Sequence, residues 1–477
     1  MTADDGLVVS HGAAISVETD TLFALAAAMA RLQADCDLLA GRASVAARVV
    51  SGTPLAAPFD VAAGPLVRAG CALREAGQHA GRLSRGVAAA AEGYEAAERR
   101  AGAFDRAAGA LIGFAAGVWT RHALLGLLPI AGWVVPLALA MQHPAVRRAV
   151  AVLGDRIAGP LVLDPALLGN PAVVGLIRAL VSSVDDAAMG VAGVPLPLAA
   201  LLGESGTGLV GLGTAASAAS AAMALGAGQA LAETPITVKA VGASPVRPPS
   251  TLAEAARRIP PAEAGEPQVR VERYEDDEGA TRYAVYVAGT ADFHAVPGDE
   301  PFDMTSNIAG VAGSDAAAQR AVEEAMRRAG VTDDDPVTIF GHSQGGLVAA
   351  RIAASESFQV DAIVTFGAPA GQIDVPSSVT QLAVEHTDDL VPALGGIPLT
   401  DASGSDRVVV SRRAFPTGPD PEAGVLPAHA MVVYQETAEA IDATDDPRIG
   451  GLLASIPVIG LGAVAGRSVL YRAERTR

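Results

Sequence analysis

One serine of this 477-residue chain has surroundings that favour nucleophilic chemistry. It follows an apolar, β-branched run at residues 337–340 and lies in a G-x-S-x-G motif, which consists of Gly341, His342, Ser343, Gln344 and Gly345. A serine on a tight strand-to-helix turn is held clear of its neighbours, and the flanking glycines allow the turn and close packing of the helix. The next N–H then lies at a helix N-terminus, where it can stabilise an oxyanion. The motif therefore predicts Ser343 as a nucleophile and Gln344 as an oxyanion donor.

Two later stretches offer the partners that a serine nucleophile requires. A serine hydroxyl reacts poorly until a histidine takes its proton and a carboxylate orients that histidine. His429 opens a predicted helix, and Asp389 follows a predicted strand, with Asp388 beside it as the alternative acid. The order Ser, Asp, His is that of α/β-hydrolases. His386 is a weaker candidate for the base, because it precedes the acid and no helix follows it.

Strand and helix signals alternate through the part of the chain that carries these residues. A helix begins at Gly345, and predicted strands occupy residues 268–274, 281–288, 337–340, 360–366, 379–385 and 407–411. Such alternation is typical of a mostly parallel sheet with helices on its faces. We therefore expect an α/β domain at residues 268–446, preceded by a Pro-rich linker at 236–267.

Residues 281–442 resemble the class 3 (fungal-type) lipase family. The motifs that carry the resemblance are G-H-S-x-G-G at 341–346, F-G-A-P at 366–369, D-L-V-P at 389–392, His429 at the start of a helix and, more weakly, Ala288-Gly289-Thr290. The resemblance implies an α/β-hydrolase fold and hydrolysis of lipid or short acyl esters through an acyl-enzyme, without cofactor. It assigns the nucleophile to Ser343, the base to His429, the acid to Asp389, and the oxyanion hole to Thr290 with Gln344.

The chain departs from this family in two places. Gln344 replaces the usual leucine after the serine, which makes the motif similar to cutinases and other actinobacterial esterases. Residues 292–303 contain no clear amphipathic lid, so activation at an interface is not implied.

Residues 1–107 predict a helical hairpin broken at Ser51-Gly52-Thr53-Pro54. Apolar residues at spacings of three and four predict a heptad seam in each arm. The first arm carries Leu22, Leu25, Met29, Leu32, Cys36, Leu39, Ala43, Ala46 and Val50, and the second carries Leu66, Ala69, Leu73, Ala76, Ala80, Leu83, Val87, Ala90, Tyr94 and Ala97. The seam places Cys36 inside and Cys71 outside, so a disulfide between them is not expected.

The hairpin resembles the small helix-turn-helix substrates of type VII (ESX) secretion. Its two Ala-rich arms and the pair Tyr94 and Glu98, which fits the Y-x-x-x-D/E export signal, carry the resemblance, although Ser51-Gly52-Thr53 replaces the Trp-x-Gly turn. The resemblance implies an exported or cell-envelope protein that meets secretion machinery. The acidic N-terminus has no apolar region of a general signal peptide. A docking or dimerising coiled coil is the alternative interpretation.

The region at residues 108–235 is rich in Ala, Gly, Leu and Val, and mean hydropathy over the whole chain is +0.34. Uncharged runs at 123–141 and 206–230 predict either membrane-associated helices or a buried layer shared with the catalytic domain. The tail at residues 447–477 is apolar with a basic end, which predicts an anchor or a docked helix. A membrane-associated cytoplasmic protein is thus the alternative to export.

Composition excludes several function classes. A net charge of −18 argues against a nucleic-acid partner. Two cysteines are too few for a disulfide framework or a zinc site, and Asp333-Asp334-Asp335 lacks the spacing of a calcium loop, so no metal is expected. The competing hypothesis is a secretion-linked or membrane-docking protein with a non-catalytic hydrolase-like domain.

Overall fold

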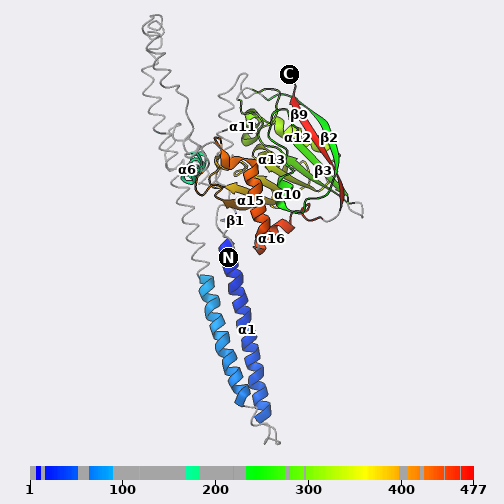
Figure 1. The fold of residues 1–477 in the computed structure, drawn as a ribbon. Coiled ribbons are helices and arrows are strands. Elements are labelled where there is room, and N and C mark those ends of the chain that lie inside the picture. Colours follow the sequence, from blue (N-terminus) through cyan, green and yellow to red (C-terminus); the bar gives the residue numbers. More distant parts are fainter. Residues whose placement is uncertain are drawn as a thin grey trace. The chain divides into compact units, whose positions relative to one another are not determined.

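The computed structural model divides the chain into two compact units (Figure 1). One unit comprises Ala14–Phe104, and the other comprises Met1–Ala13 together with Asp105–Arg477. The structure describes residues 7–11, 17–51, 64–89, 118, 168–182, 219, 233–275, 280–294, 297–396, 407–418, 424–444, 446–461 and 464–476. The predicted export residues Tyr94 and Glu98 and the apolar runs at 123–141 and 206–230 lie outside these ranges.

The larger unit is built on a nine-stranded sheet in the described ranges, with the order β1-β8-β7-β6-β5-β4-β3-β9-β2. Its strands are β1 (Val8–His11), β2 (Ile236–Val246), β3 (Val269–Glu275), β4 (Thr281–Val287), β5 (Val337–His342), β6 (Val360–Phe366), β7 (Thr380–His386), β8 (Arg407–Arg412) and β9 (Ala465–Arg475). Strands β4 to β8 are parallel, and β1, β3, β9 and β2 pair antiparallel at the two sides. The predicted strands and the mostly parallel sheet are confirmed.

Three strands come from segments for which the sequence predicted something else. Strand β1 lies in the region expected to be a hairpin, β2 in the expected linker, and β9 in the tail expected to be an anchor or a docked helix. Burial alternates along much of β9, as it does in a strand with one covered face. The tail forms a strand because it pairs with β2 and β3. These partners lie far away in the sequence, so the pattern of the tail alone did not predict the strand. No helix in the described ranges is long and apolar enough to cross a membrane.

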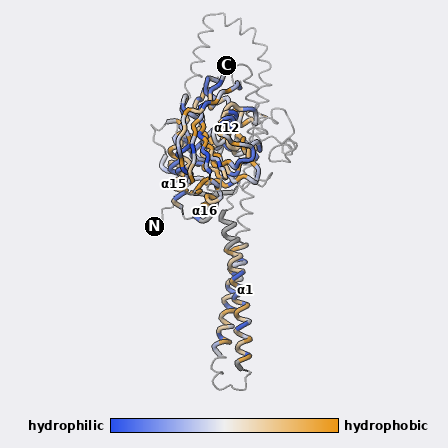
Figure 2. Tube along the Cα trace, turned by 90° about the vertical axis from the view of Figure 1, so that its right-hand side faces the viewer, coloured by the Kyte–Doolittle hydropathy of each residue, from blue (hydrophilic) through white to orange (hydrophobic). Residues whose placement is uncertain are grey.

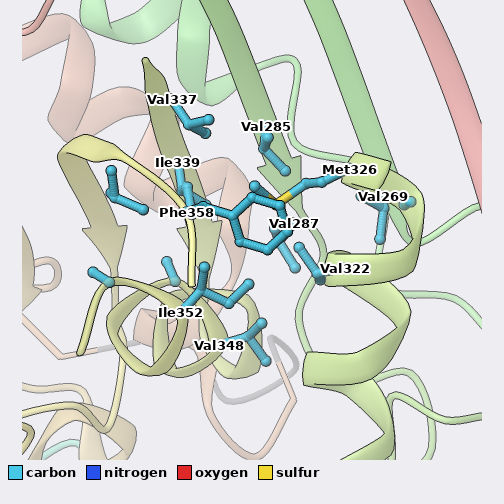
Figure 3. Packing of buried hydrophobic residues seen from close by; sticks show 14 of the residues in the cluster. Val269, Val285, Val287, Val322, Met326, Val337, Ile339, Val348, Ile352 and Phe358 are labelled. Carbon is cyan, nitrogen blue, oxygen red and sulfur yellow. The ribbon is translucent and has the colours of Figure 1, made fainter. Parts of the chain in front are cut away.

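Helices cover both faces of the sheet. Helices α11 (Met304–Ala312), α12 (Ala317–Arg328) and α13 (Gln344–Ser355) pack against one another on one face, as right-handed connections between parallel strands require. The short helix α14 (Leu390–Ala393) follows β7. Helices α10 (Leu252–Ala256) and α15 (Met431–Ala443) pack against each other, and α16 (Pro447–Ala454) follows α15. Figure 3 shows the core between α12, α13 and the strands, where Met326 and Ile352 meet Val285 and Ile339.

One helix of the apolar region belongs to the larger unit. Helix α6 (Pro171–Val181) packs against α14, and its Arg178 donates a hydrogen bond of 2.9 Å to Glu385 at the end of β7. Arg407 of β8 holds the other oxygen of the same carboxylate at 2.9 Å. At this point the apolar region therefore contributes a helix that is docked on the sheet of the larger unit.

The smaller unit contains α1 (Val17–Ser51) and a second helix at residues 64–89, as the hairpin prediction expected. Apolar positions recur along α1 (Figure 2). Ser84 donates a hydrogen bond of 2.8 Å to the carbonyl of Ala26, which links the two helices. Both cysteines are free, with Cys36 buried and Cys71 exposed.

The seam of the hairpin differs from the predicted one. Cys36 and Ala80 of the predicted seam are buried, as expected. Leu25, Leu32 and Leu39 of the predicted seam are exposed, and the neighbouring Ala26, Ala40 and Ala47 are buried instead. A Cβ added at Gly77 would lie 3.1 Å from the Cβ of Cys36. The helices therefore approach through small residues, which rotates the seam and leaves a row of leucines at heptad spacing outside it.

Candidate active site

Ser343 lies at a sharp turn between β5 and α13. Its backbone has φ 53° and ψ −120°, a conformation that costs about 1–3 kcal/mol in a residue other than glycine. The turn needs glycine on both sides, because a Cβ at Gly341 would lie 2.3 Å from the backbone of Gly345, and one at Gly345 would lie 2.3 Å from the carbonyl oxygen of Val287. The strained turn lifts the serine to the carboxyl end of the parallel strands, as the motif predicted.

Three predicted site residues meet at this turn. The Oγ of Ser343 lies 2.8 Å from Nε2 of His429, and Nδ1 of His429 lies 2.7 Å from Oδ2 of Asp389. Asp389 comes just after β7, and His429 ends a short 3-10 helix, η1 (Pro427–His429). Ser343 and Asp389 are far apart in the sequence, but the sheet brings the carboxyl ends of β5 and β7, which they follow, to the same edge.

The environment of Asp389 favours its ionised form. Burial raises the pKa of this carboxyl, but the charge of His429 and hydrogen bonds from His429, Val391 and Tyr434 outweigh it, so the pKa lies below its usual value. Oδ1 accepts the N–H of Val391 at 2.9 Å, which leaves Oδ2 to face the imidazole. An ionised carboxylate in this position can orient His429 and stabilise its protonated form.

The two alternative candidates have other contacts. Asp388 accepts the backbone N–H groups of Ala414 and Phe415 at 2.8 and 2.9 Å. His386 donates Nδ1–H to the carbonyl of Ala428 at 2.7 Å, and its Nε2 lies 2.7 Å from Oγ1 of Thr437. Both residues therefore hold the chain around the site, and neither contacts Ser343.

Tyr434 of α15 is a site residue that sequence reasoning did not find. Its hydroxyl donates a hydrogen bond of 2.7 Å to Oδ2 of Asp389, and its ring stacks on His386 at 3.9 Å between centroids. A Cβ at Gly367 would lie 2.8 Å from the same ring. Burial and the neighbouring Asp389 raise the pKa of Tyr434 well above its usual value, so the phenol keeps its proton. Its place in the helix predicted to follow His429 was the only sequence signal.

His342 of the motif is a buried neighbour of the site. Its Nε2–H donates to the carbonyl of His429 at 2.9 Å, and the two rings lie 4.8 Å apart. Burial, then the nearby His429, lowers the pKa of His342 to about 3, so the ring is neutral at ordinary pH. His342 and His386 thus hold the adjacent carbonyls of His429 and Ala428, and both fix the turn that presents His429.

The predicted oxyanion donors lie on either side of the serine. Gln344 is the first residue of α13, so its N–H has no acceptor within the helix. A Cβ at Gly289 would lie 3.2 Å from the Cβ of Ser343, which places Thr290 next to the nucleophile. Nδ2 of Asn307 donates to Oγ1 of Thr290 at 2.7 Å. This leaves the hydroxyl proton of Thr290 available to another acceptor.

The arrangement can transfer a proton from a hydroxyl to an imidazole that is supported by a carboxylate. Asn307 was a second site residue that the sequence did not reveal, because a single asparagine outside any motif carries no signal. Within the described part of the chain, no cluster of His, Cys, Asp or Glu has the arrangement to hold a metal ion.

Residues 249–391 match the model of a family described as Alpha/beta hydrolase. The match includes Thr290, Ser343, Gln344 and Asp389 and ends before His429. No curated protein and no solved structure matches the chain. With the mostly parallel sheet and its helices, the match confirms the predicted α/β-hydrolase fold.

Proposed function

We propose that the protein is a serine hydrolase that cleaves carboxylic esters, with lipid acyl esters as its substrates. The observation that carries the proposal is the continuous chain of contacts from Ser343 through His429 to Asp389, at 2.8 and 2.7 Å, on a strained strand-to-helix turn. An idle serine would not require the strain, the buried carboxylate or the aligned imidazole. The geometry matches the roles that general acid–base and nucleophilic catalysis demand.

The reaction proceeds in two halves. Oγ of Ser343 attacks the carbonyl carbon while Nε2 of His429 takes the hydroxyl proton, and the resulting oxyanion binds the N–H groups of Thr290 and Gln344. The ester C–O bond then breaks, and His429 gives its proton to the departing alcohol. Water attacks the acyl-enzyme with His429 again as the base, which releases the acid and restores Ser343. Asp389 orients the ring throughout.

Exposed apolar side chains support the choice of a lipid substrate. In the described part of the larger unit, the exposed large apolar residues are Val241, Phe293, Leu394, Val425 and Val432. All except Val241 lie close in sequence to a residue of the site: Phe293 follows Thr290, Leu394 follows Asp389, and Val425 and Val432 flank His429. Exposed apolar side chains on the segments that carry a polar site fit an amphiphilic ester whose acyl chain must leave water.

The test is hydrolysis of p-nitrophenyl esters of increasing chain length by the full chain. We expect turnover that increases from acetate to longer acyl chains and that falls by at least about a thousandfold in Ser343→Ala. The pair of substitutions Phe293→Ser and Val432→Ser should reduce turnover of the long esters but not of the acetate. Equal rates on all chain lengths would contradict the lipid assignment, and absence of turnover in folded protein would contradict the esterase assignment.

A further inference from the structure

The loop that follows Thr290 is closed on itself at its base. Backbone hydrogen bonds run from the N–H groups of Ala291 and Asp292 to the carbonyl of Phe302 at 2.8 and 3.1 Å, and from Met304 to the carbonyl of Asp292 at 3.2 Å. Asp292 and Asp303 also form a β-bridge. The position of Thr290 therefore depends on residues at the far end of the loop, around Asp303.

Asp303 connects both sides of the predicted oxyanion hole. Its carbonyl accepts a hydrogen bond of 3.1 Å from Nε2 of Gln344. Its side chain caps α11 by accepting the N–H of Ser306 at 2.8 Å, and α11 carries Asn307, which contacts Oγ1 of Thr290. A displacement of Asp303 would thus move Thr290 and Gln344 together.

Arg475 of the C-terminal strand β9 holds Asp303 in place. Its Nη2 donates to Oδ1 of Asp303 at 3.0 Å and to Oγ of Ser306 at 3.2 Å, and its backbone N–H donates to the carbonyl of Asp299 at 2.8 Å. Its Nη1 donates to Glu233 at 2.8 Å. The side chain of Arg475 is 2% exposed and that of Asp303 is 1% exposed.

A buried ion pair such as Arg475 and Asp303 fixes the positions of its two side chains more strongly than an exposed ion pair does. Removing one partner leaves the other charge buried without compensation, which is costly. Burial raises the pKa of Asp303, and the hydrogen bond from Ser306 and the charge of Arg475 act against that increase. The guanidinium spans several acceptors at fixed angles, which a lysine cannot do.

We propose that Arg475 is a positioning residue for the oxyanion hole, acting through Asp303 on Thr290 and Gln344. The inference rests on the proposed esterase function. It makes the C-terminal strand part of the catalytic unit, although this strand lies outside the segment at 249–391 that matches the hydrolase family.

The test compares three variants of the full chain. Arg475→Met removes the guanidinium, and the double variant Arg475→Met with Asp303→Asn also removes the carboxylate that would be left unpaired, while asparagine can still cap α11. The matched control is Arg472→Met on the same strand, whose side chain is 38% exposed and pairs with Glu474 at 3.1 Å. Fluorophosphonate labelling is run to completion, so that its final extent gives the number of folded sites in each sample even where a displaced oxyanion hole slows the reaction.

We expect Arg475→Met and the double variant to lose about a hundredfold in kcat per labelled site with KM unchanged, because small misplacements of catalytic groups have effects of this size. The double variant should regain thermal stability without regaining kcat, and Arg472→Met should behave as wild type. A wild-type kcat per labelled site in the double variant would overturn the positioning role while leaving the esterase intact. Wild-type protein that folds but takes no label would instead overturn the esterase function, and the positioning role with it.

Discussion

At the scale of single residues, three histidines lie close together and differ in what they can do. His429 contacts Ser343 and Asp389, whereas His342 and His386 each bind a backbone carbonyl of the turn that carries His429. Burial lowers the pKa of both His342 and His386, so they remain neutral donors. Only the histidine that faces both a hydroxyl and an ionised carboxylate is suited to accept a proton reversibly.

Tyr434 should affect both the rate and its pH dependence. Tyr434→Phe keeps the ring and removes the hydrogen bond to Asp389, which should lower kcat about tenfold to a hundredfold, since hydrogen bonds to charged groups contribute about 1.5–3 kcal/mol. That bond is one of the interactions that lower the pKa of Asp389, whereas burial, which raises it, remains. The acidic limb of kcat/KM should therefore move to higher pH.

A second tyrosine serves as the control for this prediction. Tyr283→Phe removes a hydroxyl that contacts the carbonyl of Gly330 at 3.2 Å, near the start of β5 and away from Ser343. We expect its pH profile to match wild type. Identical profiles for Tyr434→Phe and wild type would show that the phenol does not support the carboxylate.

The two adjacent aspartates should differ sharply. Asp389→Asn should reduce kcat by about 10³–10⁴-fold, because an amide cannot stabilise the imidazolium and favours the wrong tautomer. Asp388→Asn removes one of the oxygens that accept Ala414 and Phe415, and we expect a much smaller loss of kcat together with lower thermal stability. A larger loss in Asp388→Asn than in Asp389→Asn would reverse the assignment of the acid.

At the scale of elements, the sequence predicted the strands and helices that are specified by residues close together in the chain. The strand-turn-helix around Ser343 was predicted because glycine, serine and β-branched residues specify it within a short stretch. Strand β9 was not predicted, because its identity depends on pairing with β2 and β3. Its Arg475 could not be connected to Asp303 from spacing alone.

For the hairpin, the sequence predicted the two helices but not all of the residues through which they pack. The period of three and four correctly predicted two helices and the buried Cys36 and Ala80, but it also placed Leu25, Leu32 and Leu39 in the seam, where the structure has alanine and glycine. The apolar residues of a helix form a stripe along it. The size of their side chains then decides which edge of that stripe packs against the neighbouring helix.

Small residues in the seam should therefore be intolerant of enlargement. Gly77→Leu would insert a side chain where even a Cβ lies 3.1 Å from Cys36, and overpacking of this kind costs about 1–3 kcal/mol. Gly86→Leu is the matched control, because nothing lies within 4 Å of a Cβ there and leucine is a better helix former. Hydrogen exchange of the hairpin amides should show faster opening in the first variant and unchanged or slower opening in the second. Equal exchange in both would contradict the close approach.

At the scale of the whole molecule, the sequence composition did not show how distant segments join one sheet. The sheet recruits β1, β2 and β9 from segments assigned elsewhere, because an apolar or Pro-rich composition does not reveal a distant strand partner. Export through Tyr94 and Glu98 and membrane contact through the runs at 123–141 and 206–230 stay predictions. The class 3 lipase resemblance likewise stays a prediction beyond the α/β-hydrolase fold.

Buried neutral histidine should make global stability depend on pH. His342 has a pKa of about 3 in the folded protein against 6.5 as its ordinary value, so the unfolded chain binds the extra proton between these values. Its contribution is fully present above pH 6.5 and should fall by about 2 kcal/mol between pH 7 and 5. Chemical denaturation at both pH values should show this loss, and His342→Gln should lose less stability over the same interval. Equal losses in the two proteins would contradict the buried neutral state.

The most direct test of the account is labelling of the full chain by a fluorophosphonate, followed by identification of the modified residue by mass spectrometry. Such reagents react with a serine only where a base activates it and an oxyanion hole receives the phosphonyl oxygen. We predict a single modification on Ser343, lost in Ser343→Ala and strongly slowed in His429→Ala, with both variants folded. Absence of label in folded wild-type protein, or labelling that persists in Ser343→Ala, would contradict a Ser343-based hydrolase.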